Sequence, residues 1–502
     1  MNTKPKSKWY WRLLRWGLIG LAVLVTLVAI AVTEEDWRGR HAWESYKHAA
    51  EARGEHFDWA FYTPTNIPDD QNFFCAPVMA AALNTNEPGP AYFGIYRGDS
   101  KLWPTDGGNW QKQKMVDLKT WQQYFRAYNA TSEGSTNGFR LPTVQGTPAA
   151  DVLVALGTFD AAREQVRQAS LRPYAWLPLH YENGFEVAEE LMPALAYEKR
   201  CGRFFQLRAL AELADGRSDL ALDDVKLLLA VTDSMRTQPF LISHFVRLAL
   251  FSLTMQPIYE GLAQHRWNDA QLAEMEAALA KEDLLADFQT ALRGERTCAI
   301  DSFENQRLTR KMEFPSEENG VAVIVTNSMR LMPSAYFYQN ELAFAQVYEQ
   351  FILPMVDLTN HTVSVASYKS AVAENERRMK TLHYWSLYAI QSLMVFPAVA
   401  KSVEKFAAAQ GDINLARTAC ALERYRLAHG EYPPALDALA PQDIEQVPHD
   451  VINGQPLHYQ RTDDGKFVLY SVGWNETDDG GTVVLNKNGS VNREKGDWVW
   501  KY

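Results

Sequence analysis

The sequence contains none of the short motifs that mark common active sites. It has no HExxH zinc motif, no GxSxG nucleophile turn, no P-loop and no GxGxxG ahead of a helical stretch. No two of the 11 histidines are three or four residues apart, the spacing that sets two metal ligands on one helix face. Carboxylates are plentiful, but the pattern singles out no acid and base pair. We therefore favour a protein that is not an enzyme, although these absences do not exclude a reaction.

Cysteine is scarce as well. The chain has four, roughly a hundred residues apart, at Cys75, Cys201, Cys298 and Cys420. No CxxC pair is present, so the sequence does not support the usual metal knuckles or thioredoxin-like redox motifs. An even number permits disulfides if this part of the chain lies outside the cytoplasm. We favour small buried thiols, because the last three lie in helical-looking stretches.

Basic residues are under-represented in most of the chain. The sequence has 50 basic and 61 acidic residues, and five of the basic ones lie in the first 15 positions. Residues 33–502 therefore hold 45 basic and 61 acidic residues, a net charge of −16. Binding to nucleic acid needs clustered cations opposite the phosphates. We expect no nucleic-acid partner, and the acidity is typical of a soluble surface.

One long uncharged apolar run is present, at residues 16–32. With Leu13, Leu14 and a snorkelling Arg15 it reaches about 20 residues, enough to cross a bilayer. Five cations precede the run and three acidic residues follow it. The positive-inside rule then places the N-terminus in the cytoplasm. We predict a single-pass signal anchor in a bacterial inner membrane, with membrane contact through residues 13–32 and the bulk of the chain in the periplasm.

Two alternatives compete with a single uncleaved anchor. Ala29–Ala31 is an A-x-A site after an apolar core, which is also typical of a cleaved signal peptide. Residues 384–400 and 240–262 are apolar too. Polar residues and a proline interrupt the first, and His244 and Arg247 interrupt the second. We interpret both as buried helices of a soluble domain.

The remaining pattern predicts four regions. Residues 1–36 form the basic tail and anchor, 37–150 a loop-rich segment, 151–403 a mainly α-helical domain, and 404–502 a small α+β domain. This division follows the density of proline, glycine and asparagine and the change from helical to strand-like periodicity.

The helical domain contains one clear helical hairpin at residues 201–235. A turn at 215–218 joins its two helices, and small alanines mark where they would approach closely: Ala209, Ala211 and Ala221. The hairpin resembles one tetratricopeptide unit, without a repeating 34-residue period. Further along, Asn268 and Gln271 form a candidate capping box at a helix start.

The C-terminal region predicts one helix packed on a small antiparallel sheet. A helix at 412–429 ends at Gly430, which suits a left-handed cap, and a short helix follows at 435–439. Four strand-like segments come after it, at 457–461, 466–472, 482–485 and 497–500. This order favours a compact α+β domain.

The same region carries a resemblance to a known family. YRLAHGEYP (425–433), then YSVG (470–473) and the acidic loop WNETDDGG (474–481) are similar to the globular head of the type II secretion major pseudopilin. The resemblance implies protein partners through this domain. It also implies a calcium ion bound near the loop by these residues: Ser471, Asn475, Asp478 and Asp479. Oxygen ligands on a tight loop suit Ca²⁺.

The chain departs from that family in two respects. A Thr-Val-Val-Leu segment follows Gly481 where the family has a further aspartate, so a plain polar turn is the alternative to a calcium site. The fifth residue after Gly17 is Ala22, where a pilin subunit has glutamate. The chain is therefore not a pilus subunit, and as a whole it resembles large membrane-anchored bacterial envelope proteins of unassigned activity.

Three functional hypotheses follow. The first is a membrane-anchored extracytoplasmic scaffold or interaction protein, associated with a secretion or pilus-like assembly. The second is an extracytoplasmic hydrolase of envelope polymers, with a site in a groove of the helical domain near Glu295 and Arg296. The third is a binder of small ligands on the concave face of the helices.

Overall fold

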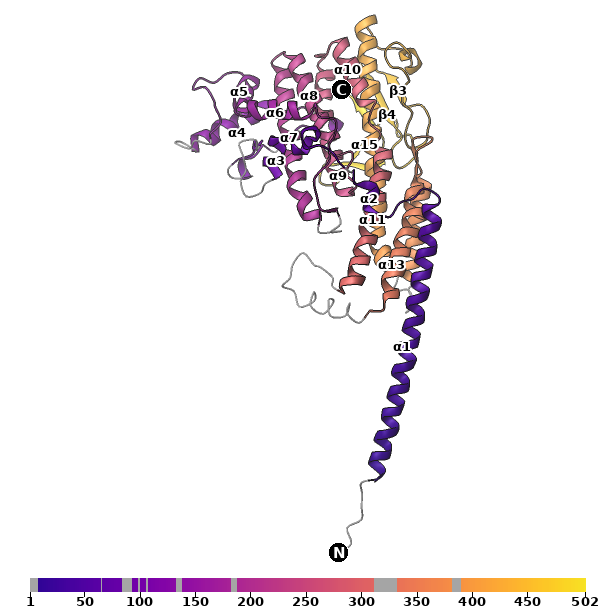
Figure 1. Cartoon of the computed structure of the whole chain (residues 1–502). Coiled ribbons are helices and arrows are strands. Elements are labelled where there is room, and N and C mark those ends of the chain that lie inside the picture. Colours follow the sequence, from indigo (N-terminus) through magenta and orange to yellow (C-terminus); the bar gives the residue numbers. More distant parts are fainter. Residues whose placement is uncertain are drawn as a thin grey trace. The chain divides into compact units, whose positions relative to one another are not determined.

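The computed structural model describes most of the chain as helix (Figure 1). The described residues are 8–64, 66–83, 93–97, 100–104, 107–131, 138–181, 187–310, 332–381 and 390–502. About 65% is helical, with few small sheets, which confirms the predicted mainly α architecture and the long apolar helix at the N-terminus. The basic tail of residues 1–7 lies outside the described residues, as does the 384–389 part of the second apolar run.

The chain forms two compact units that interleave along the sequence. The first consists of Met1–Phe61, Arg296–Gln350 and Ala373–Pro397, and the second of Tyr62–Glu295, Phe351–Val372 and Ala398–Tyr502. The four regions expected from the sequence are consecutive stretches, whereas each unit combines separate segments. The four-region division therefore stays a prediction.

The first unit is built around α1 (Lys8–Glu51). The unit also contains α13 (Ser334–Val347) and most of α2 (Trp59–Tyr62). Parts of three longer helices complete it: α11 (Leu284–Thr309), α14 (Val365–Lys380) and α15 (Ile390–His429). Every side chain from 9 to 34 is exposed, whereas Gly39, Trp43 and Ala50 further along α1 are buried. One continuous helix thus changes from an exposed apolar rod into a packed element.

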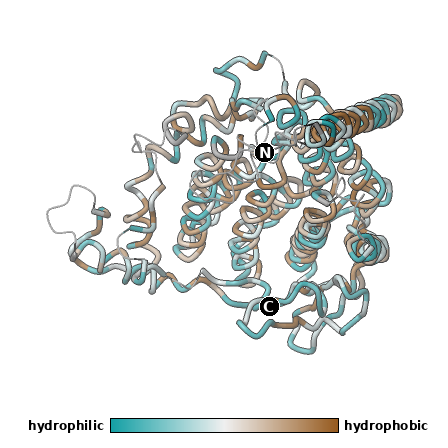
Figure 2. The backbone as a smooth tube through the Cα atoms, turned by 90° about the horizontal axis from the view of Figure 1, so that it is seen from below, coloured by the Kyte–Doolittle hydropathy of each residue, from teal (hydrophilic) through white to brown (hydrophobic). Residues whose placement is uncertain are grey.

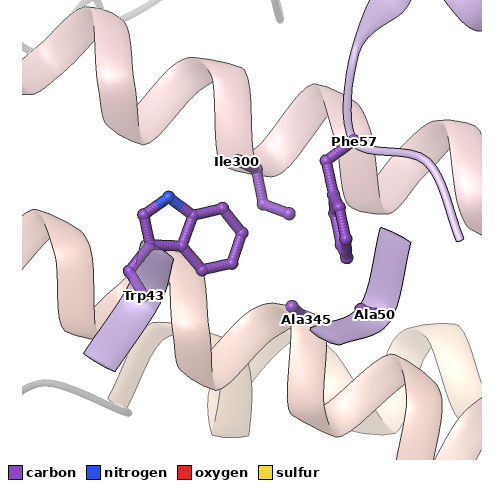
Figure 3. Close-up of a cluster of buried hydrophobic side chains, with 5 residues drawn as sticks. All are labelled: Trp43, Ala50, Phe57, Ile300 and Ala345. Carbon is purple, nitrogen blue, oxygen red and sulfur yellow. The ribbon is translucent and has the colours of Figure 1, made fainter. Parts of the chain in front are cut away.

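The core of the first unit gathers residues from α1, α11, α13 and the loop after α1: Trp43, Ala50, Phe57, Ile300 and Ala345 (Figure 3). The Trp43 and Phe57 rings meet edge to face at 5.6 Å, a favourable aromatic geometry. Gly39 allows α1 and α13 to approach closely, because a Cβ there would stand 3.1 Å from the Ala335 Cα. The docked half of α1 is therefore an integral part of the unit.

The second unit contains most of the remaining helices. They are α3 (Pro77–Leu83), α4 (Leu118–Thr131), α5 (Pro148–Leu156), α6 (Asp160–Ala169), α7 (Val187–Ala214), α8 (Ser218–Asp233), α9 (Leu241–Ala263) and α10 (Asp269–Leu279). Short 3₁₀ turns lie at Asp69–Gln71, Phe73–Cys75, Ser100–Leu102, Trp110–Lys112, Gly157–Phe159, Leu353–Met355 and Leu436–Leu439. A π-helical turn, Tyr348–Ile352, spans the point where the chain passes from the first unit into the second. Apolar and polar residues alternate along many of the helices, as amphipathic packing requires (Figure 2).

The predicted hairpin is present as α7 and α8, and its three small alanines are fully buried. A Cβ at Gly202 of α7 would lie 2.4 Å from the Leu250 Cδ2 of α9, so the missing side chain lets these helices pack closely. Asn268 and Gln271 form the predicted capping box of α10. In the most apolar stretch of α9, 67% of the residues are buried, as expected for a core helix.

The C-terminal strands form two small sheets after α15. β3 (His458–Arg461), β4 (Phe467–Ser471) and β7 (Trp498–Lys501) make an antiparallel sheet in the order β3-β4-β7, with Tyr470 opposite His458 and Val499. β5 (Val483–Leu485) pairs with β6 (Val491–Gly496). A separate two-stranded ladder joins β1 (Val356–Asp357) to β2 (Thr362–Val363).

The structure also fixes the state of the cysteines. All four lie in described parts of the chain, and none of them forms a disulfide. Cys201, Cys298 and Cys420 are buried, and Cys75 is half-buried. The interpretation as small buried thiols is confirmed for the last three cysteines and does not hold for Cys75.

Candidate functional site

The apolar half of α1 has the features of a membrane-spanning helix. By length and composition it is one of two described helices able to cross a bilayer, and its apolar window is entirely exposed, unlike that of α9. The Thr26 and Thr33 hydroxyls donate to the carbonyls of Ala22 and Ala29, both at 2.8 Å. Polar side chains in an apolar helix are thus satisfied within the helix itself, as hydrocarbon surroundings demand.

Aromatic side chains flank this stretch on both sides. Trp16 and Trp37 are each exposed, 69% and 66% respectively. They stand 21 residues apart on one helix, which corresponds to about 32 Å. The hydrocarbon core of a bilayer is about 30 Å thick, and tryptophan prefers its two interfaces. Trp16 at the start of the apolar run and Trp37 five residues beyond its end therefore lie near the positions where interfacial tryptophans are expected.

Polar contacts fix the docked half of α1. The Asp36 carboxylate accepts from the Ala335 backbone N–H at 2.7 Å and so satisfies a free donor in the first turn of α13. The Tyr46 hydroxyl donates to Glu349, and Arg53 forms an ion pair with the same carboxylate. Burial raises the pKa of Tyr46, and the contact with Glu349 raises it further by a smaller amount. The contacts of Asp36 and Tyr46 hold α1 itself at two levels, and that of Arg53 holds the turn that follows it.

The second candidate site is the acidic loop between β4 and β5. Ser471 is fully buried at the end of β4, and its hydroxyl donates to the Asp450 carboxylate at 2.9 Å. The other Asp450 oxygen accepts from the Val472 N–H at 2.9 Å. Ser471 thus anchors the start of the loop to a residue that the family resemblance does not mark.

The other three predicted ligands lie further along the loop. The Asn475 amide donates to Asp479 at 2.8 Å, so these two side chains are brought together. Asp478 accepts from the Gly480 N–H and the Tyr470 hydroxyl, both at 2.9 Å, and these bonds lower its pKa. Asn475 is half-buried, and the two aspartates are exposed.

Asp497, which the sequence analysis did not mark, organises the same loop. Its carboxylate accepts from the N–H groups of Gly481, Thr482 and Asp479 at 2.7, 3.1 and 3.2 Å. Burial nevertheless raises its pKa. Asp497 lies 16 residues beyond Gly481, immediately before β7, so no local sequence signal connects it to the loop.

These contacts place the four predicted calcium ligands in three settings. Ser471 bonds to Asp450, Asp478 bonds to Tyr470, and Asn475 and Asp479 form a pair near Asp497. Within the described ranges, no group of three or more His, Cys, Asp or Glu side chains is arranged to hold a metal ion. The two loop aspartates are exposed, and carboxylate oxygens suit a hard cation. Calcium binding by the four residues stays a prediction.

Glu295 and Arg296, proposed for a hydrolase site, belong to different units. In the second unit, Glu295 accepts from the Leu241 N–H at 2.8 Å at the start of α9, and burial raises its pKa. In the first unit, Arg296 is fully buried, pairs with Glu55 at 2.7 Å and lies 4.4 Å over the Phe57 ring. Both side chains are engaged in structural contacts.

A buried ionic cluster of the second unit went unrecognised in the sequence. Arg247 on α9 is fully buried and binds the carboxylates of Glu282 and Asp287, with Asp233 at 3.3 Å. Arg236 binds Asp233 and Glu282 as well. Burial raises the pKa of Glu282 and Asp287, and the arginines oppose that effect. The cluster joins α8, α9 and α11, and it explains how α9 accommodates a cation.

Comparisons of the chain with family models, with curated proteins and with solved structures found no match.

Proposed function

We propose that this protein is a membrane-anchored scaffold whose α1 holds the rest of the chain on the extracytoplasmic side of a bacterial inner membrane. The observation that carries the proposal is the continuity of α1. Its exposed apolar half and its docked half form one unbroken helix, with no flexible linker between them. A helix that continues unbroken from the membrane into the first unit suits a protein that presents a surface at the membrane, rather than one that diffuses to a substrate.

The surface to be positioned is residues 404–502, a pseudopilin-like interaction domain. Its support is the order of elements: the long helix α15, then the β3-β4-β7 sheet and the β5-β6 hairpin. The α7-α8 hairpin and α9 supply a tetratricopeptide-like support in the helical region. The partner class is an envelope protein of a secretion or pilus-like assembly.

Site-specific photocrosslinking in living cells tests this role. A photoreactive residue replaces Leu427 or Leu485, which are 44% and 50% exposed in the C-terminal region. Leu171, 70% exposed and outside that region, serves as the control position. We expect discrete crosslinks to one envelope protein of a secretion or pilus-like assembly from a C-terminal position only. Identical products from position 171, or no discrete product from positions 427 and 485, would contradict the proposal.

A further inference from the structure

We propose that one end of the first unit rests on the membrane, with Leu308, Met332, Met394 and Val395 in contact with lipid headgroups and upper acyl chains. This inference rests on the proposed insertion of α1. It adds a second lipid-binding surface, on the folded part of the chain, to the helix that crosses the bilayer.

Hydrogen bonds gather the ends of several helices beside α1. Asp36 of α1 binds the backbone of Ala335 near the start of α13. The Gln391 amide, at the start of α15, donates to the Tyr336 hydroxyl of α13 at 2.8 Å. Arg310, just after α11, donates to the Met332 carbonyl at 2.6 Å. The ends of α11, α13 and α15 are therefore held at the level of Asp36.

The direction of the helices agrees with these bonds. Along α13, Ala335 lies beside Gly39, and Ala345 packs with Ala50, so α13 runs parallel to α1. Ile300 of α11 lies in the same core, and the chain runs from there to Arg310, which contacts Met332 just before α13. Each of these helices thus has one end toward the apolar half of α1.

This level corresponds to the headgroup region of a bilayer. Asp36 is four residues beyond Val32, the last residue of the apolar run, a rise of about 6 Å along the helix. The headgroup layer adds about 5–8 Å on each side of the hydrocarbon core. Exposed Trp37, stacked on His41, lies at the same level, where aromatic residues are favoured.

Large apolar side chains are exposed on the gathered ends. Leu308 in the last turn of α11 is 67% exposed and Met394 in the second turn of α15 is 66% exposed. Val395 and Met332 are 42% and 36% exposed. A single exposed leucine or methionine needs no explanation, but exposed apolar residues on three adjoining chain ends indicate an interaction surface.

Cations accompany these apolar residues. Asn375 of α14 donates to the Leu393 carbonyl of α15 at 3.3 Å, which brings the last turn of α14 to the same end. That turn carries Arg377, Arg378 and Lys380, whose side chains are 65%, 41% and 79% exposed. Glu374 and Glu376 form ion pairs with these cations and reduce the net positive charge of the turn. Attraction to anionic lipid is therefore an addition to the apolar contact and not a substitute for it.

Depth-dependent fluorescence quenching tests the inference on the full chain. The protein is reconstituted in vesicles of phosphatidylcholine and phosphatidylglycerol, with Cys75→Ser removing the half-buried thiol. An environment-sensitive dye is attached to Met394→Cys or Leu308→Cys. Leu21→Cys, within the apolar run, reports on insertion of α1, and Leu485→Cys, an exposed apolar position of the second unit, is the matched control. Thermal unfolding checks that each variant is folded.

We expect lipids with a quencher near the headgroup to reduce emission at 394 and 308 several-fold more than at 485. Quenching at 21 together with values at 394 and 308 equal to that at 485 would overturn the surface contact and leave the anchor intact. A blue-shifted emission at 394 without lipid quenching would assign the surface to a protein neighbour and overturn it too. No quenching at 21 by deeply placed quenchers would contradict the anchor itself.

Discussion

At the scale of single residues, one buried carboxyl group has few hydrogen-bond partners. Glu198 on α7 is fully buried, and the Ser234 hydroxyl donates to its Oε1 at 3.0 Å. Its Oε2 is buried without a hydrogen-bond partner among the described residues. Burial raises the pKa of Glu198 from 4.5 to about 8. The folded protein therefore holds this group in its neutral form near pH 7.

The raised pKa predicts how stability changes with pH. The neutral form favours the folded state below pH 4.5, and this contribution is lost as the pH rises from 4.5 through about 8. Each pKa unit corresponds to about 1.4 kcal/mol, so the loss amounts to several kcal/mol. Because Glu198→Gln removes the ionisation, we expect its thermal midpoint to exceed that of the wild type increasingly from pH 5 to 9.

The control for this prediction is Glu164→Gln. Hydrogen bonds from Arg167 and Gln168 hold the pKa of exposed Glu164 at about 2, so it stays ionised over the same range. We expect a difference from wild type that does not change with pH. A Glu198→Gln midpoint that follows the wild type in parallel from pH 5 to 9 would contradict the assignment.

A second prediction concerns Asp497. Asp497→Asn replaces one acceptor oxygen by an amide that faces backbone N–H donors of the loop. We expect a loss of about 1–3 kcal/mol in stability, because buried donors are left unsatisfied. Thermal unfolding and the rate of proteolysis within 472–482 measure it. Exposed Asp463→Asn in the β3-β4 turn is the matched control, and equal behaviour of both variants would refute the role of Asp497.

Local residue signals were predictable where they act on near neighbours. The capping box of Asn268 and Gln271 and the left-handed Gly430 were both predicted and are both present. Asp450 and Asp497 were missed, because they bind a loop that is distant from them in the sequence. Propensity and spacing report on contacts within a few residues, and such long-range carboxylates leave no trace in them.

At the scale of elements, the sequence predicted existence and type better than extent. The helix expected at 412–429 is only the last part of α15, which starts at Ile390. Glycine normally disfavours a helix interior, by about 1 kcal/mol relative to alanine. Here Gly411 lets the Trp498 ring pack against α15, since a Cβ would stand 2.8 Å from it.

The strand β6 was not predicted, because its polar residues show no alternation of apolar and polar side chains. Its pairing with β5 defines it as a strand.

Gly39 gives a prediction at this scale. Gly39→Leu places a side chain into the contact between α1 and the Ala335 backbone. We expect a loss of about 1–3 kcal/mol in the stability of the folded protein, as for overpacked sites. Gly20→Leu makes the same change on the same helix, where nothing lies within 4 Å, and should have little effect on thermal unfolding in detergent. If Gly39→Leu were as stable as Gly20→Leu, α1 would not be docked as described.

At the scale of the whole molecule, we propose that α1 links an intracellular tail to an extracytoplasmic scaffold. The long apolar helix at the N-terminus was predictable, because an uncharged apolar run flanked by charges is a strong local signal. The interleaving of the two units was not, because the first unit collects three separate segments of sequence. Hydrophobic periodicity identifies helices but does not show which of them pack together.

Cysteine labelling of spheroplasts tests this claim most directly. Thr3→Cys and Leu485→Cys are introduced separately into a chain with Cys75→Ser and an N-terminal tag, and a membrane-impermeant maleimide is added. We predict labelling at 485 in intact spheroplasts, labelling at 3 only after lysis, and retention of the tag on both chains. Protection of position 485 before lysis, or loss of the tag through cleavage after Ala31, would contradict the account.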